Sequence, residues 1–189
     1  MNKLKLGFAM CGSFCTHRDA LAVLRDLATD YDVTPILSDT AAETDTRFGT
    51  AVLLAETLTG ICGRPPVRTI VEAEKFGPAA PLDLLFVCPC TGNTLAKIAH
   101  GITDTPVTMA AKAHLRCDRP LLIALASNDA MAGNFVNIGT LLNRKNIYFV
   151  PMKQDDPVSK PHSLVADFKK SRECLAEMRQ GRQCRPLFL

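Results

Sequence analysis

Short apolar runs alternate with amphipathic segments along most of the chain. Five such runs predict strands, at residues 4–10, 33–37, 82–87, 120–126 and 147–150. A shorter run at 67–70, isolated by loops, predicts an additional edge strand. The run from Pro120 to Ala126 is apolar at every position after the proline, so we expect that strand to be buried on both faces.

The segments between these runs have helical spacing. Leu21, Leu24, Leu27 and Ala28 fall on one face of a helix predicted over 18–30. Gly60 is expected to end the next helix, since glycine is common just after a helix. The further helices are predicted over 46–58, from the turn at 90–94 to His100, and over 104–115, 134–143 and 163–179. Residues 151–161 are expected to form a polar loop.

This alternation predicts an α/β protein, because parallel strands need helical crossover connections between them. We expect a three-layer α/β/α Rossmann-like fold with a parallel six-stranded sheet in the order 3-2-1-4-5-6. The length suits a single domain over residues 1–189, with a basic C-terminal helix and tail from about residue 163.

Small polar turns follow four of the predicted strands, at Cys11–Thr16, Ser38–Thr40, Pro89–Thr94 and Ser127–Asn128. The carboxyl ends of parallel strands share one edge of a sheet, so these turns should gather there. Each hydroxyl taken alone is better explained by helix capping, whereas their convergence favours a cofactor that carries phosphate. The first turn contains only Gly12 and lacks a GxGxxG pattern, which favours a mononucleotide over a dinucleotide.

Composition and charge exclude several classes of partner. Hydrophobic residues make up 47% of the chain and the net charge is +3, which residues 164–189 alone account for. A basic tail without interleaved aromatic residues does not indicate nucleic-acid binding. No apolar run reaches the roughly 18–20 residues of a membrane span, and the N-terminus lacks the pattern of a signal peptide. We therefore expect a cytoplasmic protein.

The eight cysteines do not form a recognisable metal site. Cys88 and Cys90 are separated by one residue, and Cys11 and Cys15 by three, so paired zinc knuckles are absent and no metal is predicted. Reduced thiols of a cytoplasmic protein most often pack as small apolar groups, and we expect packing rather than reactivity for these four.

The polar turns carry motifs that resemble those of the homo-oligomeric flavin-containing cysteine decarboxylases. That family shares its fold with flavin prenyltransferases and phosphopantothenoylcysteine decarboxylase. The matching residues are Gly12-Ser13, the PASANT-like run Pro89–Thr94, the KIANGIAD-like run Lys97–Asp104, and the NxxM segment Asn128–Met131. The resemblance spans residues 4–150 and implies a bound FMN and a homo-oligomer, a trimer or larger.

Within this family, residues 89–114 and 128–162 resemble the B subunit of a two-subunit sporulation enzyme. That resemblance implies a two-electron oxidation that aromatises a dihydropyridine dicarboxylate in the cytoplasm of the mother cell. The implied partner is an A subunit with a pyridine-nucleotide fold, on which NADP could be the acceptor.

The chain departs from the decarboxylase pattern at two places. Residues 39–58 lack the histidine that serves as the family's base, and Arg47 stands in that region. Leu125 and Ser127 replace the proline and methionine that precede the family's asparagine. Both departures disfavour cysteine decarboxylation, and an arginine suits a dicarboxylate better than it suits proton abstraction.

The candidate residues fall into two groups. Arg47 is expected to bind a substrate carboxylate, and His17 is the best acid/base candidate. Lys112 and Arg116 are further candidate cations, although a solvated helix face is the favoured explanation of those two. The candidates for binding FMN share a place at the polar turns: Gly12, Ser13, Ser38, Thr40, Pro89, Thr91, Asn93, Thr94, Ser127 and Asn128.

Three functions remain open from the sequence. The first is an oxidoreductase subunit that acts with a partner. The second is a flavin-dependent decarboxylase or flavin prenyltransferase of the same fold. The third is a non-catalytic scaffold that retains the fold and holds the A subunit.

Overall fold

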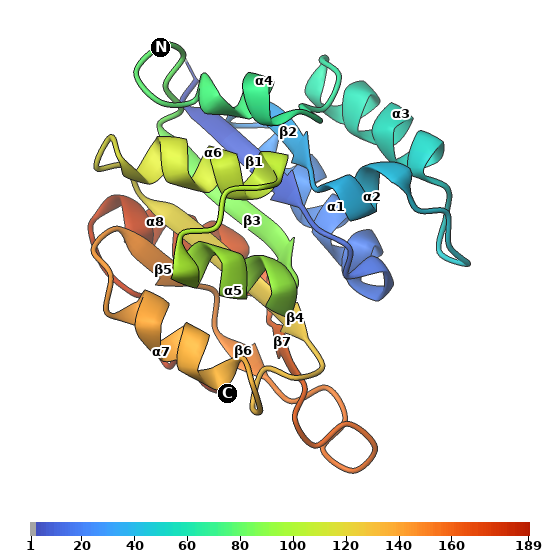
Figure 1. Ribbon diagram of the computed structural model, residues 1–189, viewed down its shortest axis with the longest axis vertical. Coiled ribbons are helices and arrows are strands. Elements are labelled where there is room, and N and C mark those ends of the chain that lie inside the picture. The colour runs from blue at the N-terminus through green and yellow to red at the C-terminus, as the bar shows by residue number, and fades with distance from the viewer. Residues whose placement is uncertain (1–2) are drawn as a thin grey trace.

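The computed structural model describes residues 3–189, and strands and helices alternate over most of that length (Figure 1). Residues 1–2 of the predicted domain lie outside the described residues. The strands are β1 (Lys5–Met10), β2 (Asp32–Leu37), β3 (Leu84–Cys90), β4 (Leu121–Ser127), β5 (Ile147–Phe149), β6 (Met152–Lys153) and β7 (Leu164–Ala166). The α-helices are α1 (His17–Leu27), α2 (Asp39–Glu43), α3 (Ala51–Cys62), α4 (Ile70–Glu74), α5 (Gly92–His100), α6 (Pro106–Leu115), α7 (Phe135–Leu142) and α8 (Ser171–Arg179). Two 3₁₀ turns complete the set, η1 (Phe14–Thr16) and η2 (Phe168–Lys170).

The strands form one sheet in the order β2-β1-β3-β4-β7-β6, with β5 also paired to β4. The pairs among β1, β2, β3, β4 and β5 are all parallel. Every residue of β3 is buried, and β1 and β4 are buried except at one end, as expected for central strands covered on both faces. The predicted α/β Rossmann-like fold is confirmed, and so is the relative order of its five main strands.

The predicted edge strand at 67–70 is reduced to a single bridge between Val67 and Ile36. The amide of Val67 donates to the Pro35 carbonyl at 2.9 Å, and the Leu37 amide donates to the Val67 carbonyl at 3.0 Å. The strand ends there because Thr69 and Glu72 form a capping box that starts α4 at Ile70.

The C-terminal prediction is wrong in its first half. Residues 164–166 form β7, which pairs antiparallel with the end of β4 and with β6, and α8 begins only at Ser171. Leu164 and Ala166 are buried while Val165 is half-buried, an alternation typical of a strand. The predicted six-stranded parallel sheet is therefore a seven-stranded mixed sheet.

The predicted helix over 46–58 is shifted toward the C-terminus. Thr50 caps α3 by accepting from the Leu53 amide, and Gly63 ends the helix in the left-handed conformation, at φ +69°. Gly60, the predicted end, lies inside the helix. Residues 44–50 thus form a loop between α2 and α3, which matters for the site described below.

Three different groups cover the outer edges of the sheet. Val67 covers part of β2, as described above. The side-chain amide of Gln183 accepts from the Phe149 amide at 2.8 Å and donates to the Phe149 carbonyl at 2.6 Å, as a neighbouring strand would. Residues 187–189 run beside β6, with the Met152 amide donating to Leu187 and the Leu189 amide to Met152.

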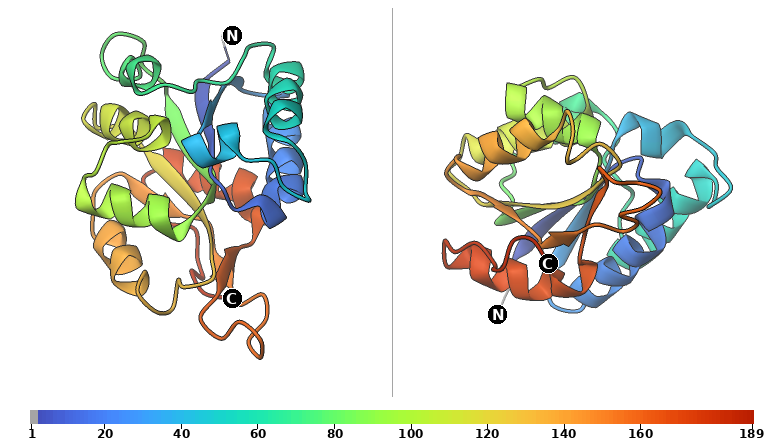
Figure 2. Two further views of the ribbon diagram at one scale, coloured as in Figure 1. Left: turned by 45° about the vertical axis from the view of Figure 1, so that its right-hand side comes forward. Right: turned by 90° about the horizontal axis from the view of Figure 1, so that it is seen from below.

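Helices cover both faces of the sheet and create two apolar cores (Figure 2). One core lies between the sheet and α4–α7, and the other between the sheet and α1, α3 and α8. In the second core the rings of Phe8 and Phe86 meet edge to face, with centroids 5.5 Å apart. Among residues 3–189 no helix is both long and apolar enough to cross a membrane.

Candidate functional site

The carboxyl ends of β1, β2 and β3 are joined by backbone hydrogen bonds. The Ser38 amide donates to the Met10 carbonyl at 3.0 Å, and the Cys11 amide donates to the Pro89 carbonyl at 3.1 Å. The polar turns after these strands are therefore neighbours at the carboxyl end of the sheet. This is the convergence that the sequence predicts, and it follows from parallel pairing of the central strands.

The first two turns approach each other most closely at Gly12. A Cβ at this position would lie 2.9 Å from the Thr40 methyl group, so only glycine allows this contact without a shift. Ser13 stands at the N-cap of η1 but makes no capping hydrogen bond, which leaves its hydroxyl available to a ligand. Ser38 is buried and caps α2 by accepting from the Ala41 amide at 3.3 Å.

The third turn starts α5. Thr91 is its N-cap, accepts from the Thr94 amide at 3.3 Å and donates from its hydroxyl to the Thr94 hydroxyl at 3.1 Å. Asn93 is exposed in the first turn of the helix, whereas Pro89 and Thr94 are buried beneath it. Capping thus accounts for Thr91, and Asn93 is the residue of this turn that faces outward.

A carboxylate that the sequence analysis missed lies against the start of α5. Asp129 accepts from the Ser127 hydroxyl and from Asn134 Nδ2, the latter at 2.8 Å. A Cβ added at Gly92 would lie 2.7 Å from Asp129 Oδ1 and 2.5 Å from Ser127 Oγ. The turn after β4 therefore places its own negative charge at the helix N-terminus, where anions are favoured. The position of Asp129 directly after the predicted Ser127–Asn128 turn was the available signal.

His17 links the first turn to α1. Its Nε2 lies 2.8 Å from the Cys11 carbonyl, which can only accept, so Nε2 carries the proton and Nδ1 has a free lone pair. Burial lowers the pKa of His17, and the hydrogen bond to Cys11 raises it by less. The ring is therefore neutral near pH 7 and can act as a base.

A cavity of about 350 Å³ opens beside His17, between α1, α2, α3 and the loop at 44–50. Its walls are mostly apolar and include Phe14, Leu21 and Leu54. Arg18 and Arg25 of α1 also line it. Of the predicted catalytic and cofactor residues, only His17 belongs to this lining in the described part of the chain.

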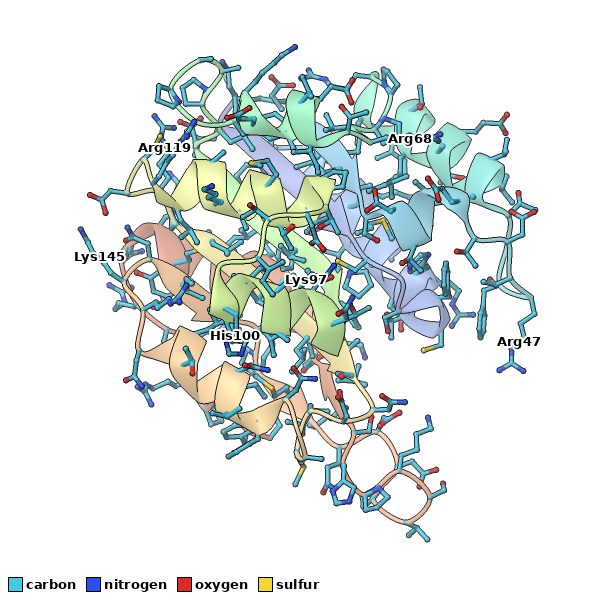
Figure 3. The ribbon with its side chains drawn as sticks, viewed as in Figure 1. Arg47, Arg68, Lys97, His100, Arg119 and Lys145 are labelled. Carbon is cyan, nitrogen blue, oxygen red and sulfur yellow. The ribbon has the colours of Figure 1, made fainter. Side chains whose placement is uncertain are left out.

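The structure does not bring Arg47 to this place. It lies in the exposed loop between α2 and α3, points away from the body of the protein (Figure 3), and stacks over the Phe48 ring at 4.9 Å. Phe48 lines the cavity, so Arg47 is one residue removed from it. Lys112 and Arg116 are exposed at the last turn of α6. That turn contacts Pro120 before the start of β4, at the amino end of the sheet and so opposite the polar turns.

Three of the four cysteines near the site are buried and structural. Cys11, Cys88 and Cys90 are fully buried, and burial raises the pKa of the Cys11 thiol to about 11. Burial also raises the pKa of Cys88 and Cys90, so all three remain neutral thiols near pH 7. The expectation of packing is confirmed for these three, whereas Cys15 is exposed and lines the cavity. Residues 3–189 contain no group of three or more side chains placed to hold a metal ion.

Comparisons with known proteins agree with this architecture. The family model "Flavoprotein" matches residues 1–179. The B subunit of dipicolinate synthase from Bacillus subtilis (strain 168) is 34% identical over 186 residues, which cover 98% of this chain and 93% of the relative.

Two solved structures are informative. The crystal structure of the B subunit of dipicolinate synthase from Bacillus halodurans superposes with a TM-score of 0.90 at 38% identity, covering 100% of this chain and 98% of the other. The FMN-dependent cysteine decarboxylase SpaF superposes with a TM-score of 0.68 at 22% identity, covering 94% and 97% of the two chains. The second likeness shows a shared fold alone.

Proposed function

Because this chain belongs to the Flavoprotein family and is homologous over its full length to the B subunit of dipicolinate synthase, we propose that it binds FMN and takes part in forming dipicolinate. The reaction is the oxidation of dihydrodipicolinate to dipicolinate, carried out with a separate A subunit. The single observation that carries the proposal is the convergence of four polar strand ends, described above, in a chain of this family.

The polar turns at the carboxyl ends of the strands are not equally suited to bind the phosphate of FMN. The Ser13 hydroxyl has no capping partner, and the contact between Gly12 and Thr40 holds the first two turns together. The first turn of α5 already faces the Asp129 carboxylate, which would repel a phosphate. We therefore assign the phosphate to Ser13, Ser38 and Thr40.

The rest of FMN then extends toward the turns after β3 and β4. Asn93 and Asn128 are exposed there and carry amide groups that can hydrogen-bond the ribityl chain or the ring edge. Ser127 and Thr94 are less available, because the first donates to Asp129 and the second accepts from Thr91.

Aromatising a dihydropyridine requires removal of a hydride and a proton. When bound, FMN supplies an acceptor for two electrons. His17 Nδ1 is the group of this chain suited to accept the proton, because the bond from Nε2 to Cys11 fixes the tautomer and the ring is neutral. Arg47 remains a proposed contact to a substrate carboxylate, made from the loop between α2 and α3.

The proposed setting follows from the same homology. The chain acts as a homo-oligomer, a trimer or larger, with an A subunit that can carry NADP. The site of action is the cytoplasm of the mother cell of a sporulating bacterium.

A spectroscopic titration tests the cofactor. The purified chain is titrated with FMN, and quenching of flavin fluorescence reports binding. Ser13→Ala should weaken binding, while the matched control Ser159→Ala, in the exposed loop between β6 and β7, should not. Equal affinity of Ser13→Ala and the control for FMN would show that Ser13 does not bind the cofactor. Absence of any FMN binding would refute FMN as the cofactor.

An activity assay tests the reaction and the third interpretation. Dipicolinate formation is measured with this chain alone, with the A subunit alone and with both together. The proposal requires that both subunits form dipicolinate faster than the A subunit alone. Full activity of the A subunit alone would make this chain a scaffold.

A further inference from the structure

The cavity between α1 and the loop at 44–50 has an unusual charge pattern. Its lining contains two arginines and a histidine, and no aspartate or glutamate. The remaining walls are largely apolar and include Phe14 from η1 and Leu54 from α3. An apolar cavity with cations and no carboxylate suits an anion that also has an apolar body.

The two arginines come from one face of α1. Arg18, Leu21 and Arg25 are spaced at i, i+3 and i+7, so they lie in a row along the helix. Leu21 lies between Arg18 and Arg25 along this face and adds an apolar side chain to the same cavity wall. This arrangement suits a rigid ligand with two carboxylates on either side of a ring.

The acidic residues of α1, Asp19 and Asp26, do not line the cavity, and Asp26 is already paired. Arg172 of α8 donates to Asp26 at 2.8 Å and also binds Asp30. Within residues 3–189, neither Arg18 nor Arg25 has a carboxylate within 4.0 Å. The cavity face of α1 is therefore cationic, while Asp26 on the face toward α8 is neutralised by Arg172.

His17 places this cavity beside the proposed cofactor turn. Its Nε2 is bonded to Cys11 at the end of β1, while its ring lies against Phe14 with the centroids 5.1 Å apart. Both rings line the cavity. A ligand held here would therefore meet the residue proposed as base and would lie next to Gly12 and Ser13.

We propose that this cavity is the binding site for the pyridine dicarboxylate, with Arg18 and Arg25 each binding one carboxylate. The inference rests on the proposed function and names the site that serves it. Phe14, Leu21 and Leu54 contact the ring, and arginine is the cation best shaped for bidentate binding of a carboxylate.

Isothermal titration calorimetry with dipicolinate as the probe tests the site without FMN or the A subunit. The native chain should bind dipicolinate, and should bind its neutral diamide far more weakly. Arg18→Gln and Arg25→Gln should each weaken binding about tenfold, as expected for loss of one charge-assisted contact. Arg179→Gln, an exposed arginine on α8, is the matched control and should bind as the native chain does. Circular dichroism of each variant verifies folding.

The outcomes separate the site from the function. Failure of the native chain to bind dipicolinate, or unchanged binding in both arginine variants, overturns the cavity assignment while leaving FMN binding and activity with the A subunit to stand on their own assays. Weakened FMN binding in Arg18→Gln and Arg25→Gln, with no dipicolinate binding, would show that the cavity binds the cofactor and not the dicarboxylate. Dipicolinate binding without FMN binding would support the dicarboxylate site and refute FMN as the cofactor.

Discussion

His114 makes the stability of this protein dependent on pH. The residue is fully buried in α6, and its Nε2 donates to the Pro120 carbonyl at 2.9 Å, which ties the helix to the start of β4. Its Nδ1 has no hydrogen-bond partner among the described residues. A second proton on this ring would therefore create a buried charge with an unsatisfied donor.

The size of the effect follows from the pKa. Burial lowers the pKa of His114 from 6.5 to about 4, with a smaller contribution from Arg119, while the bond to Pro120 opposes the change. Between these two values the unfolded chain is protonated and the folded chain is not. The free energy of unfolding should therefore be unaffected above about pH 6.5 and fall by about 3 kcal/mol as the pH drops to about 4.

Urea denaturation at a series of pH values measures this loss. His114→Gln keeps a donor for Pro120 but cannot titrate. Over the same pH range its free energy of unfolding should therefore fall by about 3 kcal/mol less than that of the native chain. His100→Gln, at the exposed end of α5, is the matched control and should follow the native chain (Figure 3). Parallel pH curves for the native chain and His114→Gln would refute this account.

Three further substitutions probe the site and the core. Gly92→Ala should destabilise the protein by about 1–3 kcal/mol and weaken FMN binding, because its Cβ would displace Ser127 and Asp129; thermal unfolding and flavin titration measure both. Gly60→Ala is its control, since that Cβ meets nothing within 4 Å, and a loss equal to that of Gly92→Ala would contradict the contact. Phe86→Ala should cost about 3–5 kcal/mol in urea, and a cost under about 1 kcal/mol would be inconsistent with a packed ring pair. Thr105→Ala should cost about 1 kcal/mol by removing the N-cap of α6, and an unchanged melting temperature would show that the cap is dispensable.

The central part of the fold was predictable because its signals are local and strong. The run Leu121–Ala126 can only be buried on both faces, and its neighbours in the sheet follow from the alternation with helices. The edges were not predictable in the same way. Leu164–Ala166 is too short for its period to distinguish a strand from a helix, and its pairing with β4 is a long-range contact.

The candidate site shows the same division. The polar turns were found because strand ends of a parallel sheet must meet, and Gly12, Ser13 and Ser38 lie as that rule requires. Arg47 was selected by its place in the chain alone, and the direction of an exposed loop depends on packing that no local pattern encodes. The Asp129 contact with α5 was missed because it joins two separate turns.

The covered edges of the sheet limit how copies of this chain can assemble. Strand addition needs a free row of backbone donors and acceptors, and Val67, the Gln183 amide and residues 187–189 each occupy part of such a row. A homo-oligomer of this protein would therefore be assembled through helix faces and loops, not by continuing the sheet from one copy into the next. The same protection guards against uncontrolled fibre growth, since the chain supplies its own edge partners.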